Sequence, residues 1–362
     1  MMLKFLKHSV WNCLASSANK AHNLSFKKFV SIYFGNLCKT NRNNQELYTG
    51  PWSILFYGSD DFALHSFKVL NERYRSKNLI KRLEVVTAYK GKENALINYA
   101  TKNGILVHTW PLSVPITQFD LGLVVSFGHM IPAEVIDAFP LGMINVHASL
   151  LPKLRGAAPI IRAIMNGDSL TGVTIMRIMP EKFDIGEILA QEEIPIHPDE
   201  TMPELYTKLA KLGSDLLIKT VEKLPDVLHQ GREQNSADAT YAPKITAKAS
   251  VIRWNKMSAQ NVYNLQRALT GLYSLTTKFE GIAIKLHGIR VYEEPVSLAN
   301  SDEEKPGCVF YDKKKNLLLI QCKDNTWISV DEIVVPGRRA MSGKDFRNGF
   351  MSKYKESLII FH

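Results

Sequence analysis

The sequence has few of the features that metal centres, disulfide frameworks and nucleotide-binding loops require. Its 362 residues include four cysteines, which show no C-x-x-C spacing and no clustered histidines beside them. Both a zinc site and a disulfide framework are therefore disfavoured. No run of about 18 apolar residues occurs, so we expect no membrane span. A single glycine, Gly58, follows the first expected strand and no Walker-type loop is present, so NAD and P-loop chemistry are unsupported.

Acidic residues are missing from the first 45 positions. Residues 1–45 carry seven Lys or Arg, five Ser and no Asp or Glu, and Leu3, Leu6, Val10 and Leu14 recur at helical spacing. Such a basic amphipathic segment is typical of a mitochondrial transit peptide, whereas a secretory signal needs an uninterrupted apolar region. A disordered basic tail is the alternative.

The remaining composition is that of an ordinary globular protein, with 45% apolar and 22% charged residues. The length allows two domains with sizeable cores. The formal charge of residues 1–45 is +7, that of residues 46–244 is −3 and that of residues 245–362 is +6. A basic C-terminal region favours a polyanionic partner.

Apolar runs of strand length alternate with helical patterns after residue 50, which predicts a doubly wound, mostly parallel α/β sheet in residues 46–243. The expected strands are 53–57, 83–89, 105–108, 121–127, 143–146 and 171–178, and the expected helices are 62–74, 95–101, 159–166 and a long one after Thr201.

Residues 225–250 lose periodicity, and we expect the linker there. A helix over 258–269 and short alternating segments at 275–279, 282–286, 309–311, 317–321 and 327–330 follow. Short strands with turn residues between them predict a small β-barrel in residues 244–362.

The stretch 141–162, LGMINVHASLLPKLRGAAPIIR, contains the main candidate site. Asn145 and His147 lie two apart at the end of an expected strand, so both side chains point to one side, where open α/β sheets build their sites. An amide can donate to an oxyanion and an imidazole can move a proton near neutral pH. Taken alone, such a pair is more often a strand end with a hydrogen-bonded histidine than a catalytic site.

A second polar residue follows another expected strand. Asp184, in the sequence FDIG, could orient His147 or a water molecule. A turn-forming aspartate is the alternative interpretation.

The ordered segments INVHASLLPKLRGAAPIIRAI, GDSLTGVTIMRI and FDIGEIL resemble the signature of the 10-formyltetrahydrofolate-dependent formyltransferases, and most of all the members that act on methionyl-tRNA. The resemblance implies that Asn145, His147 and Asp184 form the catalytic trio and that the second domain is OB-like. It implies a folate co-substrate, 10-formyltetrahydrofolate, whose pterin ring is held by the loop residues Phe127, Gly128, His129, Met130 and Ile131. Within that loop, His129 is interpreted as a surface or packing histidine in preference to a catalytic one. The irregular apolar segment Ser149, Leu150, Leu151 and Pro152 is expected to form a wall for the same flat ligand.

The resemblance also implies methionyl-tRNA as the partner and formylation of its α-amine in the mitochondrial matrix. Basic residues that could contact RNA phosphates are Arg155, Lys313, Lys314, Lys315, Arg338 and Arg339; solvated surface charge is the alternative for each. The loop at 88–95 is shorter than the basic insertion of bacterial members and keeps Lys90 and Lys92. We expect a monomer with no membrane partner.

Three other functions use part of the same pattern. A 10-formyltetrahydrofolate hydrolase and a formyltransferase for a small amine would share the trio but need no basic barrel. A non-catalytic RNA-binding protein would need the barrel but not the trio.

Overall fold

The computed structural model describes residues 50–88, 94–112, 116–296, 305–354 and 358–362, and residues 50–362 form one compact unit. The predicted transit peptide and the residues Lys90 and Lys92 lie outside the described residues. In the part of the chain that is described, no helix has the length and apolar character needed to cross a bilayer.

A seven-stranded sheet in the order β3-β2-β1-β4-β5-β6-β7 organises the first part of the unit. Strands β1 to β5 pair in parallel, whereas β6 and β7 extend one edge in antiparallel fashion. The prediction of a mostly parallel α/β sheet is confirmed. The strands are β1 (Trp52–Gly58), β2 (Ile80–Thr87), β3 (Val107–Thr109), β4 (Leu121–Val125), β5 (Met143–His147), β6 (Leu170–Arg177) and β7 (Ile188–Pro195).

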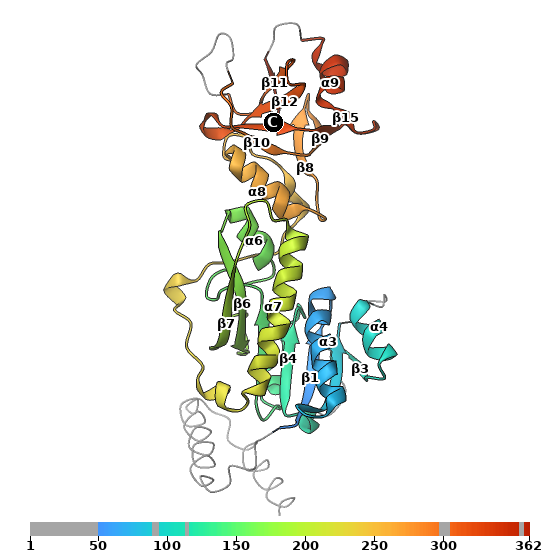
Figure 1. Cartoon of the computed structure of the whole chain (residues 1–362), viewed down its shortest axis with the longest axis vertical. Helices are drawn as coiled ribbons and strands as arrows, with labels where there is room; N and C mark the ends of the chain where they lie inside the picture. Colours follow the sequence, from blue (N-terminus) through green and yellow to red (C-terminus); the bar gives the residue numbers. More distant parts are fainter. Residues whose placement is uncertain (1–49, 89–93, 113–115, 297–304, 355–357) are drawn as a thin grey trace, which may run out of the picture. The chain divides into compact units, whose positions relative to one another are not determined.

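Both faces of this sheet are covered, because the central strands are apolar on both sides. In β1, Ile54 and Phe56 belong to the larger core, whereas Leu55 and Tyr57 belong to a second cluster on the other face. Helices α3 and α7 lie side by side against the larger core (Figure 1). The helices of this part are α3 (Asp61–Ser76), α4 (Ala95–Lys102), α5 (Ala133–Ile136), α6 (Pro159–Asn166) and α7 (Met202–Glu222), with a 3₁₀ turn η2 at Ile116–Gln118.

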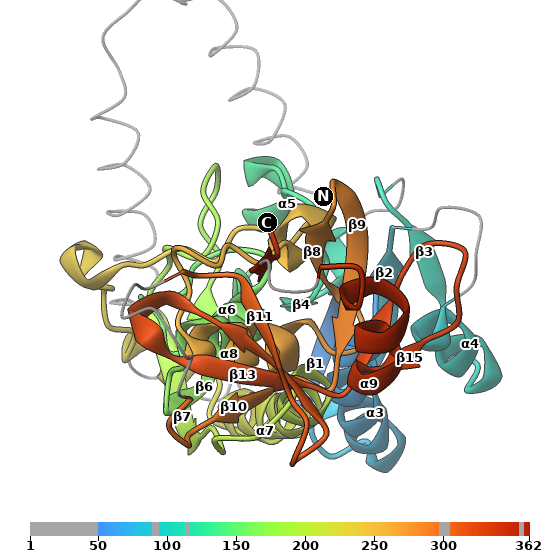
Figure 2. The ribbon, with the colours of Figure 1, turned by 90° about the horizontal axis from the view of Figure 1, so that it is seen from above.

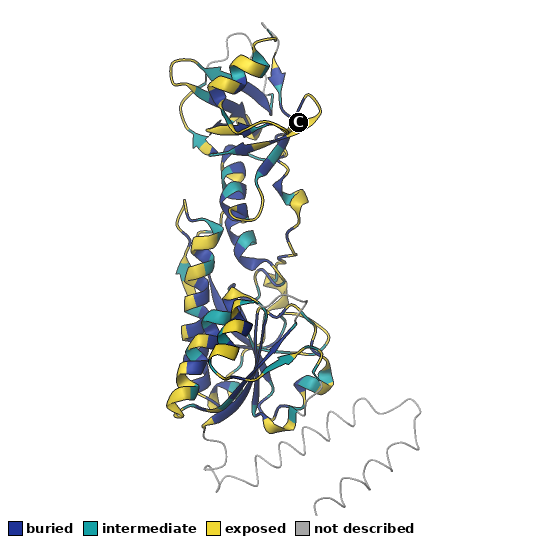
Figure 3. Cartoon of the chain, turned by 90° about the vertical axis from the view of Figure 1, so that its right-hand side faces the viewer, coloured by how far each residue is buried: buried dark blue, intermediate teal, exposed yellow. Residues whose placement is uncertain are grey.

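The helix starts follow from local chemistry. Asp60 caps α3 by accepting a hydrogen bond from the Ala63 N–H at 3.1 Å. At the start of α7, the Glu204 carboxylate accepts from the Thr201 N–H at 2.8 Å. Figure 3 shows that α7 alternates between buried and exposed residues along its length, as expected for a helix with one apolar face.

Antiparallel strands form the C-terminal part, in two sheets of order β10-β13-β12-β11-β16 and β15-β14-β9-β8. The predicted small β domain is therefore present as a domain of antiparallel strands, whereas its OB-like barrel form stays a prediction. Helix α8 (Ala259–Leu269) packs against strands of both sheets (Figure 2). The strands are β8 (Leu275–Phe279), β9 (Ile282–His287), β10 (Arg290–Tyr292), β11 (Cys308–Asp312), β12 (Leu317–Gln321), β13 (Trp327–Val330), β14 (Glu332–Val334), β15 (Met341–Ser342) and β16 (Ile359–Ile360). A 3₁₀ turn, η6 (Lys323–Asn325), lies between β12 and β13, and helix α9 (Gly343–Phe346) and the π turn η7 (Arg347–Met351) lie between β15 and β16.

The segment that connects the two parts runs through three 3₁₀ turns, η3 (Asp226–His229), η4 (Ser236–Asp238) and η5 (Ala247–Ser250). The two hydrophobic cores meet at helices α6 and α8, because Ile161 and Met165 of α6 pack against the C-terminal core while Ala268 of α8 belongs to the larger N-terminal one. The domain limits at 243 and 244 stay a prediction.

Candidate active site

A cavity of about 620 Å³ opens at the carboxyl ends of β4 and β5. Asn145 and His147 both line it, so the two side chains reach the same side of β5 as the strand pattern predicts. The His147 side chain is buried, and Asn145 is half-buried. The volume is of the size that proteins use for drug-sized ligands.

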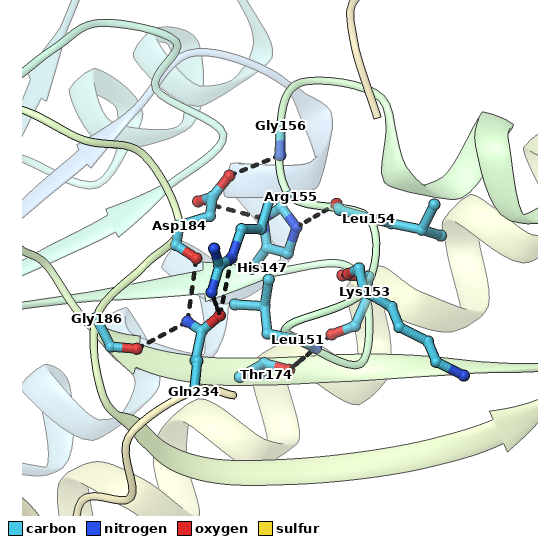
Figure 4. Close-up of polar contacts among 11 residues, drawn as sticks. His147, Leu151, Lys153, Leu154, Arg155, Gly156, Thr174, Asp184, Gly186 and Gln234 are labelled. Atoms are coloured by element: carbon cyan, nitrogen blue, oxygen red, sulfur yellow. Dashed lines mark hydrogen bonds and ion pairs between the residues drawn. The ribbon is translucent and has the colours of Figure 1, made fainter. Parts of the chain in front are cut away.

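The hydrogen bond of His147 with Leu154 identifies its tautomer. Its Nε2 lies 3.0 Å from the carbonyl oxygen of Leu154 (Figure 4). A carbonyl oxygen only accepts, so Nε2 carries the proton and donates it. In the neutral ring, Nδ1 therefore has a free lone pair and is the nitrogen that can take up a proton.

The carboxylate of Asp184 faces that nitrogen. Its Oδ1 lies 3.6 Å from His147 Nδ1, and the two side chains are 11% and 7% exposed. The separation is longer than a hydrogen bond, but it suits stabilisation of an imidazolium once Nδ1 is protonated. The structure thus brings Asp184, which is distant from His147 in sequence, to the cavity wall that Asn145 and His147 share.

Asp184 is held from two sides. Its Oδ2 accepts from the Gly156 N–H at 2.8 Å, and its carbonyl oxygen accepts from Gln234 Nε2 at 3.0 Å. The backbone of Asp184 is left-handed, with φ of +57°, a conformation that costs a non-glycine residue about 1–2 kcal/mol. Two residues on, a Cβ at Gly186 would lie 1.7 Å from the carbonyl oxygen of Arg177, so only glycine fits.

The loop that follows β4 supplies one wall of the cavity. All five of its predicted folate-binding residues line the cavity with Asn145 and His147. Phe127 is anchored by edge contacts with Tyr57 and Trp110, each at a centroid distance of 5.4 Å. The His129 ring is tilted by 60° from the Phe127 ring, at a centroid distance of 5.3 Å. The residues of this wall are Phe127, Gly128, His129, Met130 and Ile131.

The second predicted folate-binding segment does not line the cavity. The Ser149 hydroxyl donates to the Lys153 carbonyl at 2.7 Å, and the Leu151 N–H donates to the Thr174 hydroxyl oxygen at 3.1 Å. Leu151 is buried in a small cluster with Met176 and Ile188. These bonds hold Ser149 and Leu151 against the protein, and Leu150 and Pro152 are half-buried. The folate contact of this segment stays a prediction.

The predicted tRNA contact of Arg155 is also not supported by the structure. The residue is 7% exposed, and its Nε and Nη2 donate to Gln234 Oε1 at 3.0 and 2.7 Å. A guanidinium buried and bonded in this way is not available to a phosphate group. The motif alone could not distinguish it from a surface cation.

The other predicted RNA-binding residues are on the surface. Lys313, Lys314, Arg338 and Arg339 are exposed. Lys315 is also exposed, and its amine donates to the Tyr292 hydroxyl at 3.1 Å and forms an ion pair with Glu294. Four of these five cations therefore remain candidates for phosphate contacts, whereas the charge of Lys315 is already paired.

Sequence reasoning missed one acid of the cavity, Asp60. The Ser126 hydroxyl donates a hydrogen bond to the Asp60 carboxylate. Burial of this carboxyl raises its pKa above the usual value, because the charged form loses contact with water. Asp60 follows β1, whose neighbour β4 pairs with β5. Its place after a central strand was the available signal, because polar residues at the carboxyl ends of adjacent parallel strands converge. In the described part of the chain, no group of three potential metal ligands is found.

Comparison with known proteins identifies the family. Residues 113–221 match the family model for formyl transferase, and residues 244–351 match that for the formyl transferase C-terminal domain. The chain is 38% identical over 309 residues to the methionyl-tRNA formyltransferase, mitochondrial, of Homo sapiens, covering 83% of this chain and 78% of the relative. It is 38% identical over 231 residues to the methionyl-tRNA formyltransferase of Caldicellulosiruptor saccharolyticus, covering 64% and 71%.

Two solved structures share the fold. One is a sugar 3N-formyl transferase determined with dTDP and 5-N-formyl-THF, with a TM-score of 0.56, 19% identity and coverage of 80% of this chain and 100% of that chain. The other is an N-formyltransferase of Helicobacter canadensis in complex with folinic acid and dTDP-3-aminofucose, with a TM-score of 0.56, 18% identity and coverage of 77% and 98%. From the two matched family models and the long similarity to its relatives, the chain belongs to the methionyl-tRNA formyltransferase family.

Proposed function

We propose that this protein transfers the formyl group of 10-formyltetrahydrofolate to the α-amine of methionyl-tRNA. The observation that carries the proposal is the pairing of His147 Nδ1 with Asp184 beside Asn145 at the wall of the cavity. The family membership supports the same reaction. The mostly apolar cavity, closed on one side by Phe127 to Ile131, is large enough for a pterin ring.

The reaction joins the amine nitrogen to the formyl carbon and breaks the bond from that carbon to N10 of the folate. The Asn145 amide donates a hydrogen bond to the oxyanion that forms on the formyl oxygen. His147 Nδ1 accepts the proton that the amine releases, because Nε2 is already committed to Leu154. Asp184 stabilises the resulting imidazolium, which then returns the proton to the departing N10.

This assignment asks for no covalent intermediate, since an amine is already a competent nucleophile for a formyl group. Holding the two substrates together and stabilising the oxyanion supply most of the acceleration. Proton transfer by His147 adds about 10²–10⁴-fold.

We also propose a separate role for each part of the chain. Residues 46–243 would form the catalytic domain and residues 244–362 the tRNA-binding domain, in which Lys313, Lys314, Arg338 and Arg339 contact phosphates. Residues 1–45 would direct the protein to the mitochondrial matrix, in keeping with their composition and with the mitochondrial relatives.

The test follows two products in one reaction. The full chain is incubated with 10-formyltetrahydrofolate and methionyl-tRNA, and formyl-methionyl-tRNA and free formate are measured together. Wild type should formylate the tRNA, His147→Ala should lose almost all of that activity, and the exposed His229→Ala should retain it. Formate release that does not depend on tRNA would instead identify a hydrolase, and transfer to a small amine in preference to tRNA would identify the other alternative.

A further inference from the structure

We infer that Gln234 is a positioning residue for the proposed reaction, and that Arg155 acts through it. Gln234 belongs to the segment that connects the two cores, far from the catalytic motif in sequence. Its side chain joins the two loops that hold His147 and Asp184 (Figure 4). The inference rests on the function proposed above.

The amide of Gln234 is fully used. Nε2 donates to the carbonyl oxygens of Asp184 and Gly186 at 3.0 and 2.8 Å. Oε1 accepts from Nε and Nη2 of Arg155 at 3.0 and 2.7 Å. Two carbonyl acceptors on one end and a guanidinium on the other leave only one orientation for the amide.

This arrangement connects the two partners of the proposed catalytic pair. Arg155 directly follows Leu154, whose carbonyl oxygen accepts the Nε2–H of His147. On the other side of the amide is the backbone of Asp184, whose carboxylate faces His147 Nδ1. Gln234 therefore spans the gap between the loop that orients the imidazole and the loop that orients the carboxylate.

The Asp184 loop needs such support because its backbone is unfavourable. Asp184 and Glu181 both have left-handed backbones, with φ of +57° and +68°. The neighbouring Phe183 is 55% exposed, so packing holds the loop only weakly. The two hydrogen bonds from Gln234 compensate by tying the carbonyl groups on either side of residue 185 to a buried arginine.

The connecting segment is itself anchored to the motif. The Arg155 N–H donates to the Thr240 carbonyl at 2.8 Å, and the Ala242 N–H donates to the Arg155 carbonyl at 2.7 Å. The Leu154 N–H donates to the Thr240 hydroxyl oxygen at 2.8 Å. Residues 234–242 therefore support the active site in addition to linking the two domains.

The chemistry of the amide makes the inference specific. Gln234→Met keeps the length of the side chain but removes all four hydrogen bonds. Gln234→Glu keeps the acceptor for Arg155 and loses both donors to the Asp184 loop. Because the bonds to that loop are the ones that position the carboxylate, we expect both variants to be impaired to a similar extent.

The experiment is a double-mutant cycle in the full chain, with Gln234→Met, Asp184→Asn and the two combined. Gln234→Met should lower kcat for methionyl-tRNA formylation roughly 10- to 100-fold, as displacement of a catalytic group does, with both KM values within about threefold. In the Asp184→Asn background the same change should lower kcat less than threefold, because its target is already removed. Glu233→Gln, at an exposed neighbouring position, is the matched control and should have the kcat and KM values of the wild type.

Several outcomes overturn the inference. A kcat of Gln234→Met or Gln234→Glu within twofold of wild type would do so. A kcat of the double variant that is reduced by the product of the two single reductions would also do so, since a merely structural role predicts independent effects. If Gln234→Met does not fold, the near-isosteric Gln234→Glu carries the same cycle. A wild type that releases only formate would refute the proposed transfer, and the cycle on formate release would still test Gln234. A wild type with neither activity would refute both proposals.

Discussion

Replacing Asp184 with asparagine isolates the charge that faces His147. Asparagine has nearly the same shape, and its carbonyl oxygen can still accept from the Gly156 N–H that now bonds Oδ2 at 2.8 Å. The left-handed backbone at this position is one that asparagine also tolerates. The substitution thus removes one negative charge and leaves the loop in place.

The size of the effect follows from the separation of 3.6 Å between the carboxylate and Nδ1. For unit charges at that distance, the interaction is about 1 kcal/mol at the dielectric constant of water and about 5 kcal/mol at an effective value of 20. Side-chain exposures of 7% and 11% place the pair near the second figure. Because only part of the charge develops in the transition state, we expect kcat to fall about 10²–10³-fold.

The assay is steady-state formylation of methionyl-tRNA at saturating 10-formyltetrahydrofolate, with thermal unfolding of each variant as the control for folding. Asp215→Asn, at an exposed position of α7, removes an equal charge away from the cavity and should leave kcat unchanged. A fall of less than threefold in Asp184→Asn would refute the electrostatic role of this carboxylate.

Three further outcomes are expected. Gly186→Ala should destabilise the protein by about 1–3 kcal/mol and lower activity, because its Cβ would meet the Arg177 carbonyl oxygen at 1.7 Å; denaturant unfolding measures this. The pair Lys313→Glu and Lys314→Glu should raise the KM for tRNA and reduce its salt dependence without changing the KM for folate; kinetics at several salt concentrations measure this. Burial raises the pKa of the Cys322 thiol to about 12, so between pH 9 and 12 the folded state keeps a proton that the unfolded state loses. The free energy of unfolding should therefore fall over this range, by up to about 1.4 kcal/mol per pH unit from this group. In Cys322→Ala it should fall less steeply.

Each of these has a result that would contradict it. An unchanged unfolding midpoint in Gly186→Ala would mean that the loop relaxes without loss. Equal effects from reversing two exposed lysines of α7 would show that total charge, and not the turn between β11 and β12, determines tRNA affinity. Identical pH profiles for wild type and Cys322→Ala would show that the thiol does not ionise in the unfolding equilibrium.

Local sequence determined much of the fold. The apolar strand 143–146 placed Asn145 and His147 on one side, and the structure has both on the cavity wall. Helix α6 and the strands β8, β12 and β13 have the predicted limits, because an apolar run bounded by turn residues determines a short element by itself. Strand β7 was missed, since its sequence ILAQEEIP is polar and half-exposed and gains its partners only beside β6.

What the tertiary structure decided is which polar groups meet. Asp184 comes within reach of His147 because two loops from different strands converge there. Arg155 has the residue type of a phosphate-binding cation, yet the fold buries it against Gln234, a residue without any local signal. Ser149 and Leu151 are buried for a similar reason, since the Thr174 hydroxyl on β6 accepts from the Leu151 N–H and donates to the Ser149 carbonyl. Periodicity reports the environment of a residue along its own element, whereas these contacts join positions 23 to 79 residues apart and depend on how the elements pack.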